Sequence, residues 1–219
     1  MKSLRGRYAF TLVELLVVIA IIAILMGLLL PVTTVVTNNA RKVQALHIAH
    51  DVVVAINTYQ AEYAQYPAPV NRLDDGNDFF AADNGGYIGN TAIKQSDLMD
   101  ILRVPSTTNP SLNVTTYNSR LVQYLDVPPV KDNRNPVSGI DQDGFLRDPW
   151  GGYYRVRMDT NYNHQLPNPY TADTGAGPDP LTAGVIVWSI GKDGMGGLDK
   201  SGNGPKNTGA SQDDIVSWQ

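Results

Sequence analysis

The chain of 219 residues contains no cysteine, and charged side chains make up only 17% of it. The absence of cysteine excludes a disulfide framework, a cysteine-ligated zinc site and a thiol nucleophile, but it leaves the cellular compartment open. Acidic residues outnumber basic ones by 21 to 17, which gives a net charge of -4. Because phosphate contacts need a basic face, this balance argues against nucleic acid as a partner.

The apolar residues are concentrated at one end of the chain. The averages, 42% hydrophobic residues and a mean hydropathy of -0.19, are those of one ordinary soluble domain. However, no charged or strongly polar side chain occurs in 15–30, whereas the chain after Thr37 is rich in Asp, Asn, Gly and Pro. Lys2, Arg5 and Arg7 make the first residues basic. The amino-terminal segment therefore differs in kind from the rest.

Residues 10–30 are long enough to cross a membrane. As a helix rising about 1.5 Å per residue, they would cover roughly the 30 Å of a bilayer core. The positive-inside rule keeps the basic flank cytoplasmic and places the chain after Pro31 on the far side. A cleaved secretory signal fits poorly, because its apolar core is usually shorter and a small-residue cleavage site should follow it. A plain anchor fits the length but does not explain Glu14, since an unpaired charge at depth costs about 2.5 to 3.5 kcal/mol.

A third interpretation comes from the string Ala9-Phe10-Thr11-Leu12-Val13-Glu14-Leu15-Leu16, which continues as apolar residues to Ile22. This string resembles the class III signal of type IV pilins and of type II secretion pseudopilins. The resemblance implies that a prepilin peptidase removes the leader 1–9 after Ala9 and methylates the new terminus at Phe10. It also makes Glu14 the family's assembly glutamate and Pro31 its helix-kinking proline. Ala9 departs from the usual Gly, which indicates slower or differently specific processing.

The positions of Phe10 and Glu14 suggest how subunits could assemble. The new amino group at Phe10 is a cation in lipid, and Glu14 is the anion that could neutralise it within the chain or in a neighbouring subunit. The two groups lie about one helical turn apart. A neighbour shifted along the axis by a similar rise would bring its terminus against Glu14, so the pair could set the register of a filament.

After Pro31 the helical pattern continues as an amphipathic segment, 31–66. Apolar residues recur at helical spacing (Val43, Leu46, Val53, Ile56 and Tyr63). Pro67 and Pro69 forbid further helix. The pattern predicts one helix over about 10–65, roughly 80 Å long. His47 and His50 have a spacing that could hold a metal, but no third ligand is nearby and we interpret them as exposed or core-edge residues.

Residues 70–144 give few signals. Loop and turn chemistry dominates, with a predicted helix over Asp97–Val104 and a helix or strand over Leu121–Leu125. We find no nucleophile motif and no phosphate-binding loop here. This region is interpreted as a variable insertion that decorates a small scaffold.

Residues 145–219 predict an antiparallel sheet. The turn Asp148-Pro149-Trp150-Gly151-Gly152 precedes a predicted strand over Tyr153–Arg157, and a Pro- and Gly-rich loop over 166–180 leads to a strong strand over Gly184–Ile190. The turn, the segment Gly191–Gly194 and the ending Asp213–Trp218 resemble the major, G-type pseudopilin of type II secretion. Tyr63–Pro67 at the helix end shares the resemblance.

The acidic, glycine-rich tail, 193–214, has almost no apolar side chains that could form a hydrophobic core. Oxygen ligands on a flexible loop suit Ca²⁺, which accepts 6 to 8 of them at about 2.3 to 2.6 Å. G-type pseudopilins hold calcium in this loop, and the resemblance implies Asp193, Asp213, Asp214 and the backbone of Ile190 as ligands. Two weaker matches to calcium loops also occur (Asp199, Ser201 and Asn203; Asp141-Gln142-Asp143-Gly144). A metal-free, solvated turn remains the alternative at each of these places.

Together these features predict an α+β, pilin-like fold, in which a long helix is packed on a small antiparallel sheet with long loops. The expected parts are a leader, 1–9, a transmembrane segment, 10–30, an amphipathic continuation, 31–66, and a periplasmic head, 67–219. Within the head, 70–144 is the variable insertion and 145–219 carries the sheet and the calcium loop.

The resemblance implies a structural subunit of a type II secretion pseudopilus, not an enzyme, which polymerises through its helix and helps to export folded proteins. The expected location is the inner membrane, with a single crossing. The expected partners are further copies, minor pseudopilins, the inner-membrane assembly platform, prepilin peptidase and lipid. Two alternatives stay open. One is a type IV pilus subunit for adhesion, motility or DNA uptake. The other is a membrane-tethered carbohydrate or protein binder that uses aromatic residues of the head (Trp150, Tyr153, Tyr154 and Trp188), although the same residues are also interpreted as core residues.

Overall fold

The structure is a computed structural model of the whole chain. It describes residues 10–68, 79–81, 86–88, 91–104, 113–170, 174–194 and 213–219. At 28–32, in the strands between 79 and 93, and at 174, only the backbone is described. The described chain divides into two compact units, 1–40 and 41–219.

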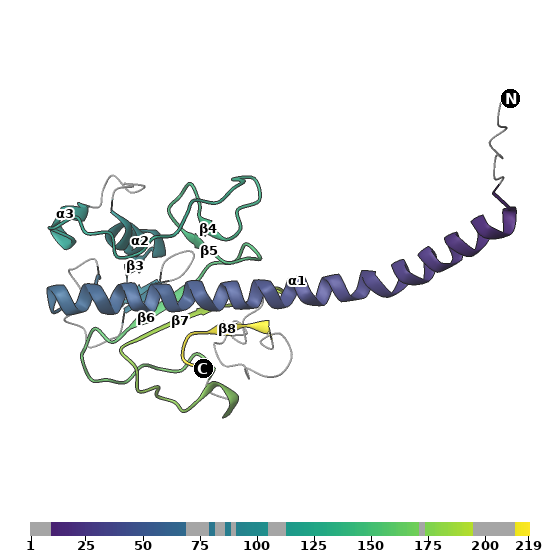
Figure 1. Cartoon of the computed structure of the whole chain (residues 1–219). Helices are drawn as coiled ribbons and strands as arrows, with labels where there is room; N and C mark the ends of the chain where they lie inside the picture. Colours follow the sequence, from purple (N-terminus) through teal and green to yellow (C-terminus); the bar gives the residue numbers. More distant parts are fainter. Residues whose placement is uncertain are drawn as a thin grey trace, which may run out of the picture. The chain divides into compact units, whose positions relative to one another are not determined.

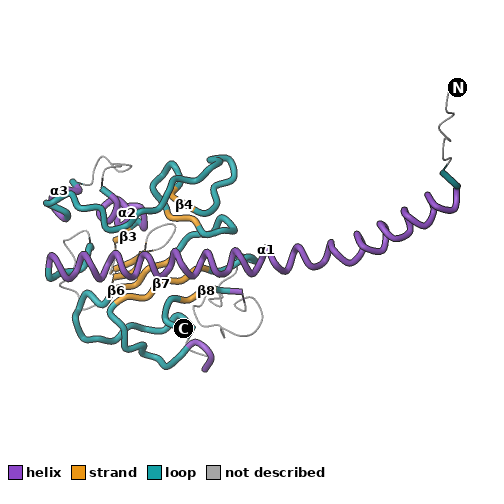
Figure 2. The backbone as a smooth tube through the Cα atoms, in the orientation of Figure 1, coloured by secondary structure: helices purple, strands orange, loops and turns teal. Residues whose placement is uncertain are grey.

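The fold is α+β, with one long helix followed by short strands and helices (Figures 1 and 2). This is the pilin-like arrangement that the sequence predicts. The elements in chain order are α1 (Leu12–Tyr63), β1 (Phe79–Ala81), β2 (Gly86–Ile88), β3 (Thr91–Ile93), α2 (Gln95–Arg103), α3 (Val114–Tyr117), β4 (Gly139–Ile140), β5 (Leu146–Arg147), β6 (Arg155–Met158), η1 (Thr174–Ala176), β7 (Val185–Ser189) and β8 (Ile215–Val216).

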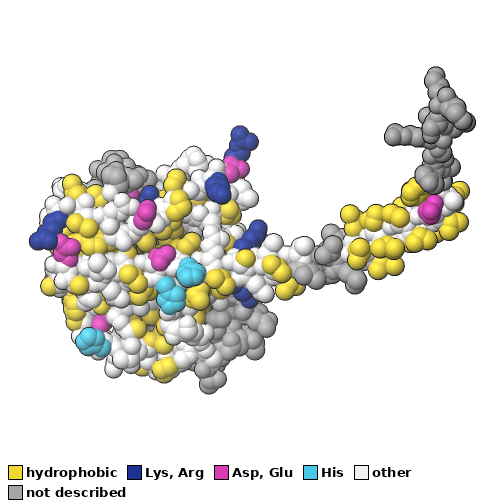
Figure 3. Space-filling model, viewed as in Figure 1, with side chains coloured by type: hydrophobic (Ala, Val, Ile, Leu, Met, Phe, Trp, Pro, Cys, Tyr) yellow, Lys and Arg dark blue, Asp and Glu magenta, His cyan; other side chains and the backbone are white. Residues whose placement is uncertain are grey.

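The first unit consists of the amino-terminal part of α1. Its large apolar side chains are exposed from Phe10 to Met26, and Figure 3 shows hydrophobic side chains along this part of the helix. The helix continues through Pro31 without a break in its assignment. Among the residues that the structure describes, no helical stretch satisfies the length and hydrophobicity that a membrane crossing requires.

In the second unit, one face of α1 packs on the sheet. The buried face carries small residues at helical spacing, Ala45, Ala49 and Ala55, together with larger ones (Val52, Ile56 and Tyr59). They share a hydrophobic core with side chains of β6 and β7 (Val156, Met158, Val185 and Val187). Figure 1 shows this part of α1 lying across the two strands.

The predicted apolar stripe is confirmed only in part. Ile56 is fully buried in the main core, and Val53 and Tyr63 are partly buried and pack against it, whereas Val43 is 56% exposed. Three alanines take the central positions, because a small side chain lets the helix backbone approach the sheet closely. The prediction favoured large apolar residues and missed these alanines.

The main sheet has the strand order β1-β6-β7-β8 within the described residues, and each of its pairs is antiparallel. The antiparallel pairing of β6 with β7 confirms the predicted sheet, with Val156 opposite Val187. All five residues of β7 are buried. The short ladders β2-β3 and β4-β5 lie outside this sheet.

Residues between 70 and 144 contribute to this framework. Strand β1 pairs with β6, and the predicted helix is confirmed as α2, whose Leu98 and Ile101 are fully buried in the main core. The expected element over Leu121–Leu125 is wrong, because this segment has no regular structure. Its backbone is instead held by α2, since the amides of Tyr124 and Leu125 both donate to the carbonyl oxygen of Leu102.

The end of α1 differs slightly from the predicted boundary near residue 65. The helix ends at Tyr63, and Ala64 has a φ of 56° in the left-handed region. The Ala64 amide donates to the carbonyl oxygen of Gln60 at 2.8 Å, as in a helix that closes on a left-handed residue. The helix therefore terminates before Pro67 is reached.

Candidate functional site

Glu14 takes part in a capping box at the start of α1. The backbone amide of Thr11 donates to Oε2 of Glu14 at 2.9 Å, and the Thr11 hydroxyl donates to the same oxygen at 2.8 Å. In return, the amide of Glu14 donates to the Thr11 hydroxyl oxygen at 3.2 Å. Reciprocal bonds of this kind satisfy amides that the first helical turn would leave unpaired. They fix the start of α1 at Leu12.

The predicted cleavage point lies immediately before this capped turn. Ala9 is outside the described residues, and Phe10 is 75% exposed and precedes the helix. Cleavage after Ala9 would leave the Phe10–Thr11 peptide intact, so both Thr11 donors survive processing. Thr11 is thus a partner of Glu14 that the sequence interpretation did not consider. The amino group of a processed Phe10 stays a predicted partner.

The structure brings together three carboxylates that the sequence analysis singled out as calcium ligands. One oxygen each from Asp193, Asp213 and Asp214 lies within 4.8 Å of the other two. Asp193 is exposed, Asp213 is half-buried and Asp214 is buried. The three residues come from the turn after β7 and the segment that enters β8, two strands paired in the main sheet. We call this group the acidic cluster. Ile190 lies between β7 and this turn.

The backbone holds Asp213 in place. Its Oδ2 accepts hydrogen bonds from the amides of Lys192 and of Asp193, the latter at 3.1 Å. Gly191 lies against it at a φ of +67°, and a Cβ at that position would come within 2.5 Å of the Asp213 carbonyl oxygen. Only glycine allows this close approach without displacement of the backbone.

Asp214 is held from the other side by Tyr170. The Tyr170 hydroxyl donates to Oδ2 of Asp214 at 2.7 Å, and both residues are buried. Burial of the ring, and then the charge of Asp214, raise the pKa of Tyr170 above its usual value. The hydroxyl therefore keeps its proton and acts as a donor. Sequence reasoning did not find Tyr170, because it is 44 residues away and its loop has no recognisable motif.

The predicted Asp-Pro-Trp-Gly turn supports the end of β7. Oδ1 of the fully buried Asp148 accepts from the amides of Trp150 and Gly152, both at 2.8 Å. Its Oδ2 accepts from the Ser189 hydroxyl at 2.5 Å, and the Ser189 oxygen in turn accepts from the Gly191 amide at 3.1 Å. Asp148 thus fixes the position from which the turn of the acidic cluster starts.

The donor set fits a hard divalent cation. Two oxygens bound to the same Ca²⁺ at its usual ligand distances lie at most about 5 Å apart, which matches the spacing within the acidic cluster. Three carboxylates at this spacing repel one another, and a divalent cation would offset that repulsion. The close approach of Gly191 to the Asp213 backbone brings the two segments of the cluster near each other.

The other candidate metal ligands have different outcomes. Asp199, Ser201 and Asn203 lie outside the described residues. Asp141 is committed to its own turn, since Oδ2 accepts from Nε of Arg147 at 2.7 Å and Oδ1 accepts from two amides. These bonds stabilise the turn.

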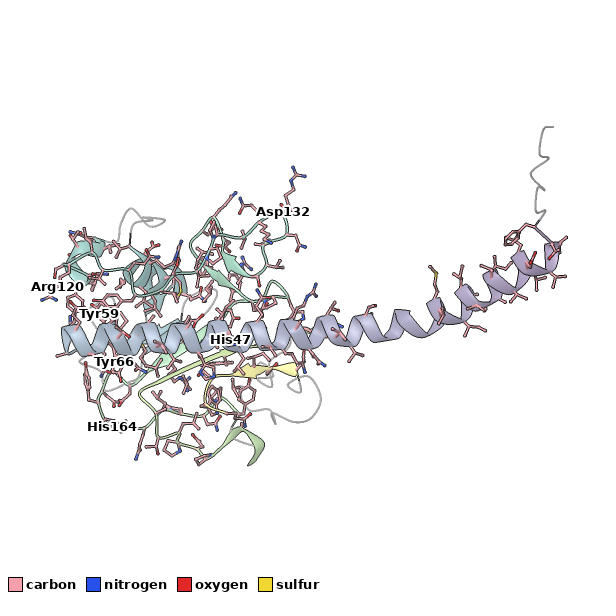
Figure 4. All side chains as sticks on the ribbon, in the orientation of Figure 1. His47, Tyr59, Tyr66, Arg120, Asp132 and His164 are labelled. Atoms are coloured by element: carbon pink, nitrogen blue, oxygen red, sulfur yellow. The ribbon has the colours of Figure 1, made fainter. Side chains whose placement is uncertain are left out.

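Among the described residues, no histidine joins a group of three or more potential metal ligands. His47 and His50 are exposed on α1, and His164 lies in a separate part of the head (Figure 4). Of the aromatic residues considered for ligand binding, Tyr154 and Trp188 are at most 1% exposed. They belong to the core.

Comparison with known proteins supports the interpretation of the amino-terminal segment. Residues 4–30 match the family described as the prokaryotic N-terminal methylation motif. No curated protein and no solved structure matches the chain significantly. The match supports a membrane-anchored, type IV pilin-like protein with prepilin-type processing. It ends before the second unit begins at Arg41.

Proposed function

We propose that this chain is a structural subunit of a type II secretion pseudopilus, which polymerises through its amino-terminal helix and helps to export folded proteins. The observation that carries the proposal is the methylation motif over residues 4–30, with Phe10 placed directly before a capped helix. The exposed apolar surface of the first unit supports it as well, because such a surface needs lipid or sibling helices as partners.

In this proposal the leader 1–9 is removed by prepilin peptidase, and Phe10 becomes an N-methylated terminus. The helix stays in the inner membrane until the assembly platform adds the subunit to the filament, alongside further copies and minor pseudopilins. The head faces the periplasm. Growth at the base would push cargo towards the outer membrane, so the work is mechanical and needs no catalytic group.

The first test concerns Phe10 and Glu14. Expressed with a prepilin peptidase and the assembly platform, the protein should begin at an N-methylated Phe10 by mass spectrometry and should form filaments. The Glu14→Ala variant should still be processed and inserted but should assemble poorly, because the neighbouring amino group loses its anion. Asp51→Ala is the control, since it removes an exposed carboxylate elsewhere on α1.

Two results would count against this proposal. Normal filament assembly by Glu14→Ala would remove the role of that carboxylate, and a monomer that keeps Met1 would favour a tethered binding module. A type IV pilus subunit is distinguished in the native host. Deletion of the gene should abolish protein secretion in a pseudopilus and surface filaments in a pilus.

We further propose that the acidic cluster binds Ca²⁺ and that the ion stabilises the end of the sheet. Asp193, Asp213 and Asp214 would be its ligands, together with a backbone oxygen near Ile190. Their mutual spacing supports this proposal, and so does the chemistry of an all-oxygen donor set. With no cysteine in the chain, an ion is one of the few remaining ways to crosslink the two strands.

The second test is removal of the metal. The detergent-solubilised chain in Ca²⁺ at about 100 times Kd should be more stable than in EDTA by roughly 2.7 kcal/mol. For a domain of this size, that corresponds to a rise in Tm of roughly 5 to 10 °C by calorimetry. Mg²⁺ at the same concentration is the control, because it prefers a smaller octahedral site. Equal Tm values in Ca²⁺ and in EDTA would overturn the calcium proposal.

A further inference from the structure

Tyr170 connects the acidic cluster to a second hydrophobic core. This second core consists of Leu166, Tyr170, Ala176, Leu181, Ile186, Trp188 and Val216, and it is separate from the core between α1 and the sheet. Tyr170 is 1% exposed, and its hydroxyl reaches Oδ2 of Asp214 at 2.7 Å. A residue of the loop between β6 and β7 is thus hydrogen-bonded to a carboxylate of the acidic cluster.

The position of Tyr170 is fixed from its own side of this contact. The Tyr170 amide donates to Oδ1 of Asn168 at 2.9 Å. The buried Asn168 amide group donates in turn to three successive carbonyl oxygens, at 3.0 to 3.2 Å (Ala176, Gly177 and Pro178). Asn168 thereby ties both sides of the loop together around the Tyr170 ring.

Two further contacts extend this arrangement. The ring of Tyr170 lies 6.2 Å from that of Trp218, whose indole nitrogen donates to the Ala176 carbonyl oxygen at 2.7 Å. Leu166 and Leu181 pair their backbones in both directions, at 2.9 and 2.8 Å. The loop is therefore closed at its base by a backbone bridge, and it touches the acidic cluster through Tyr170.

We propose that Tyr170 is a positioning residue for the divalent cation: it orients the Asp214 carboxylate through Oδ2 and couples occupancy of the acidic cluster to the order of the loop segments 166–170 and 174–181. The inference rests on the proposed calcium binding. Hydrogen bonds from outside the ligand sphere set the direction of ligand oxygens, and their loss typically weakens metal affinity by about 10- to 100-fold. Coupling of this kind is reciprocal, so the cation should stabilise the loop as the loop favours the cation.

Tyr170→Phe tests the role of the hydroxyl while it preserves the ring in the core. The full chain in detergent micelles is titrated with Ca²⁺, and Kd is measured by competition with a chelating indicator. We expect the variant to bind Ca²⁺ at least about 10-fold more weakly than the wild type. A loss of packing alone would lower the stability in EDTA without changing Kd, so the two quantities separate positioning from structure.

Tyr59→Phe is the matched control. Tyr59 is a fully buried tyrosine of α1 (Figure 4), and its hydroxyl donates to the Tyr117 carbonyl oxygen at 2.6 Å in the main core. Its removal should leave the Kd for Ca²⁺ within about twofold of the wild type. An unchanged Kd in Tyr170→Phe, with a wild type that binds Ca²⁺, would overturn this inference alone. A wild type without Ca²⁺ binding would overturn the calcium proposal and this inference with it.

A second measurement uses only the wild type, so it tests the coupling between the cation and the loop even if Tyr170→Phe fails to fold. Hydrogen exchange of the wild-type amides of Leu166 and Leu181 should slow severalfold when Ca²⁺ replaces EDTA. The Leu146 amide, which donates to the side chain of Gln95 in the main core, is the internal reference. Equal slowing at all three amides, or none at the two loop positions, would show that the cation does not act on the loop in particular.

Discussion

Gly191 and Gly194 share a backbone φ of +67° but have different surroundings. A Cβ at Gly191 would lie 2.5 Å from the Asp213 carbonyl oxygen, whereas a Cβ at Gly194 would have nothing within 4 Å. The two positions therefore separate the cost of a left-handed backbone from the cost of a blocked approach.

We expect Gly194→Ala to lose about 1 to 2 kcal/mol of unfolding free energy, the usual cost of this backbone region for a residue with a Cβ. Gly191→Ala should lose roughly 1 to 3 kcal/mol more, because the backbone of Asp213 must move away. Urea unfolding of the two variants in EDTA measures the difference. Equal losses would mean that the turn relaxes freely around the new methyl group.

The residues of the acidic cluster illustrate what a sequence can reveal about a site. Asp193 and Asp213 are 20 positions apart, and no local pattern predicts that they meet. A family resemblance supplied them as candidates. Tyr170 belongs to a loop without a motif, so its contact with Asp214 follows only from the pairing of β7 with β8 and the folding of that loop.

At the scale of elements, Gln95 joins α2 to the strands beside it. Its fully buried side-chain amide donates to the carbonyl oxygen of Tyr154 at 2.7 Å and accepts from the amide of Leu146 at 2.7 Å. One side chain thus satisfies backbone groups at β5 and just before β6. A buried polar group left without such a partner costs about 1 to 3 kcal/mol.

Gln95→Leu should therefore lower the unfolding free energy by roughly 2 to 4 kcal/mol, since it removes the partner of two buried backbone groups. Denaturant unfolding of the full chain in micelles measures this. Gln142→Leu, at an exposed position, should change the free energy by less than about 0.5 kcal/mol. Similar effects from the two substitutions would assign the loss to leucine itself rather than to the lost amide.

Long elements were predictable and very short ones were not. Helix α1 follows from a continuous apolar run joined to a periodic one, and β7 follows from its β-branched residues. Strand β8 has two residues and β1 has three, too few for alternation to be visible in the sequence. The buried face of α1 was predicted only in part for another reason, since alanines such as Ala45 and Ala49 carry little hydrophobic signal but fit a close contact.

At the scale of the whole molecule, the two units are recognised by different means. The first unit has a motif that depends on a few side chains at fixed spacing, and residues 4–30 match it. The second unit, 41–219, is defined by its core and by long loops, for which a sequence offers no comparable pattern. The sequence therefore allows the processing of the amino terminus to be inferred in more detail than the function of the head.

The capping box at Thr11 has a consequence for how subunits could exchange. Both Thr11 donors use Oε2 of Glu14, so the other oxygen, Oε1, is the one to meet an incoming amino group. In a filament of the proposed kind, a subunit could therefore dock and leave while the first turn of its helix remains closed.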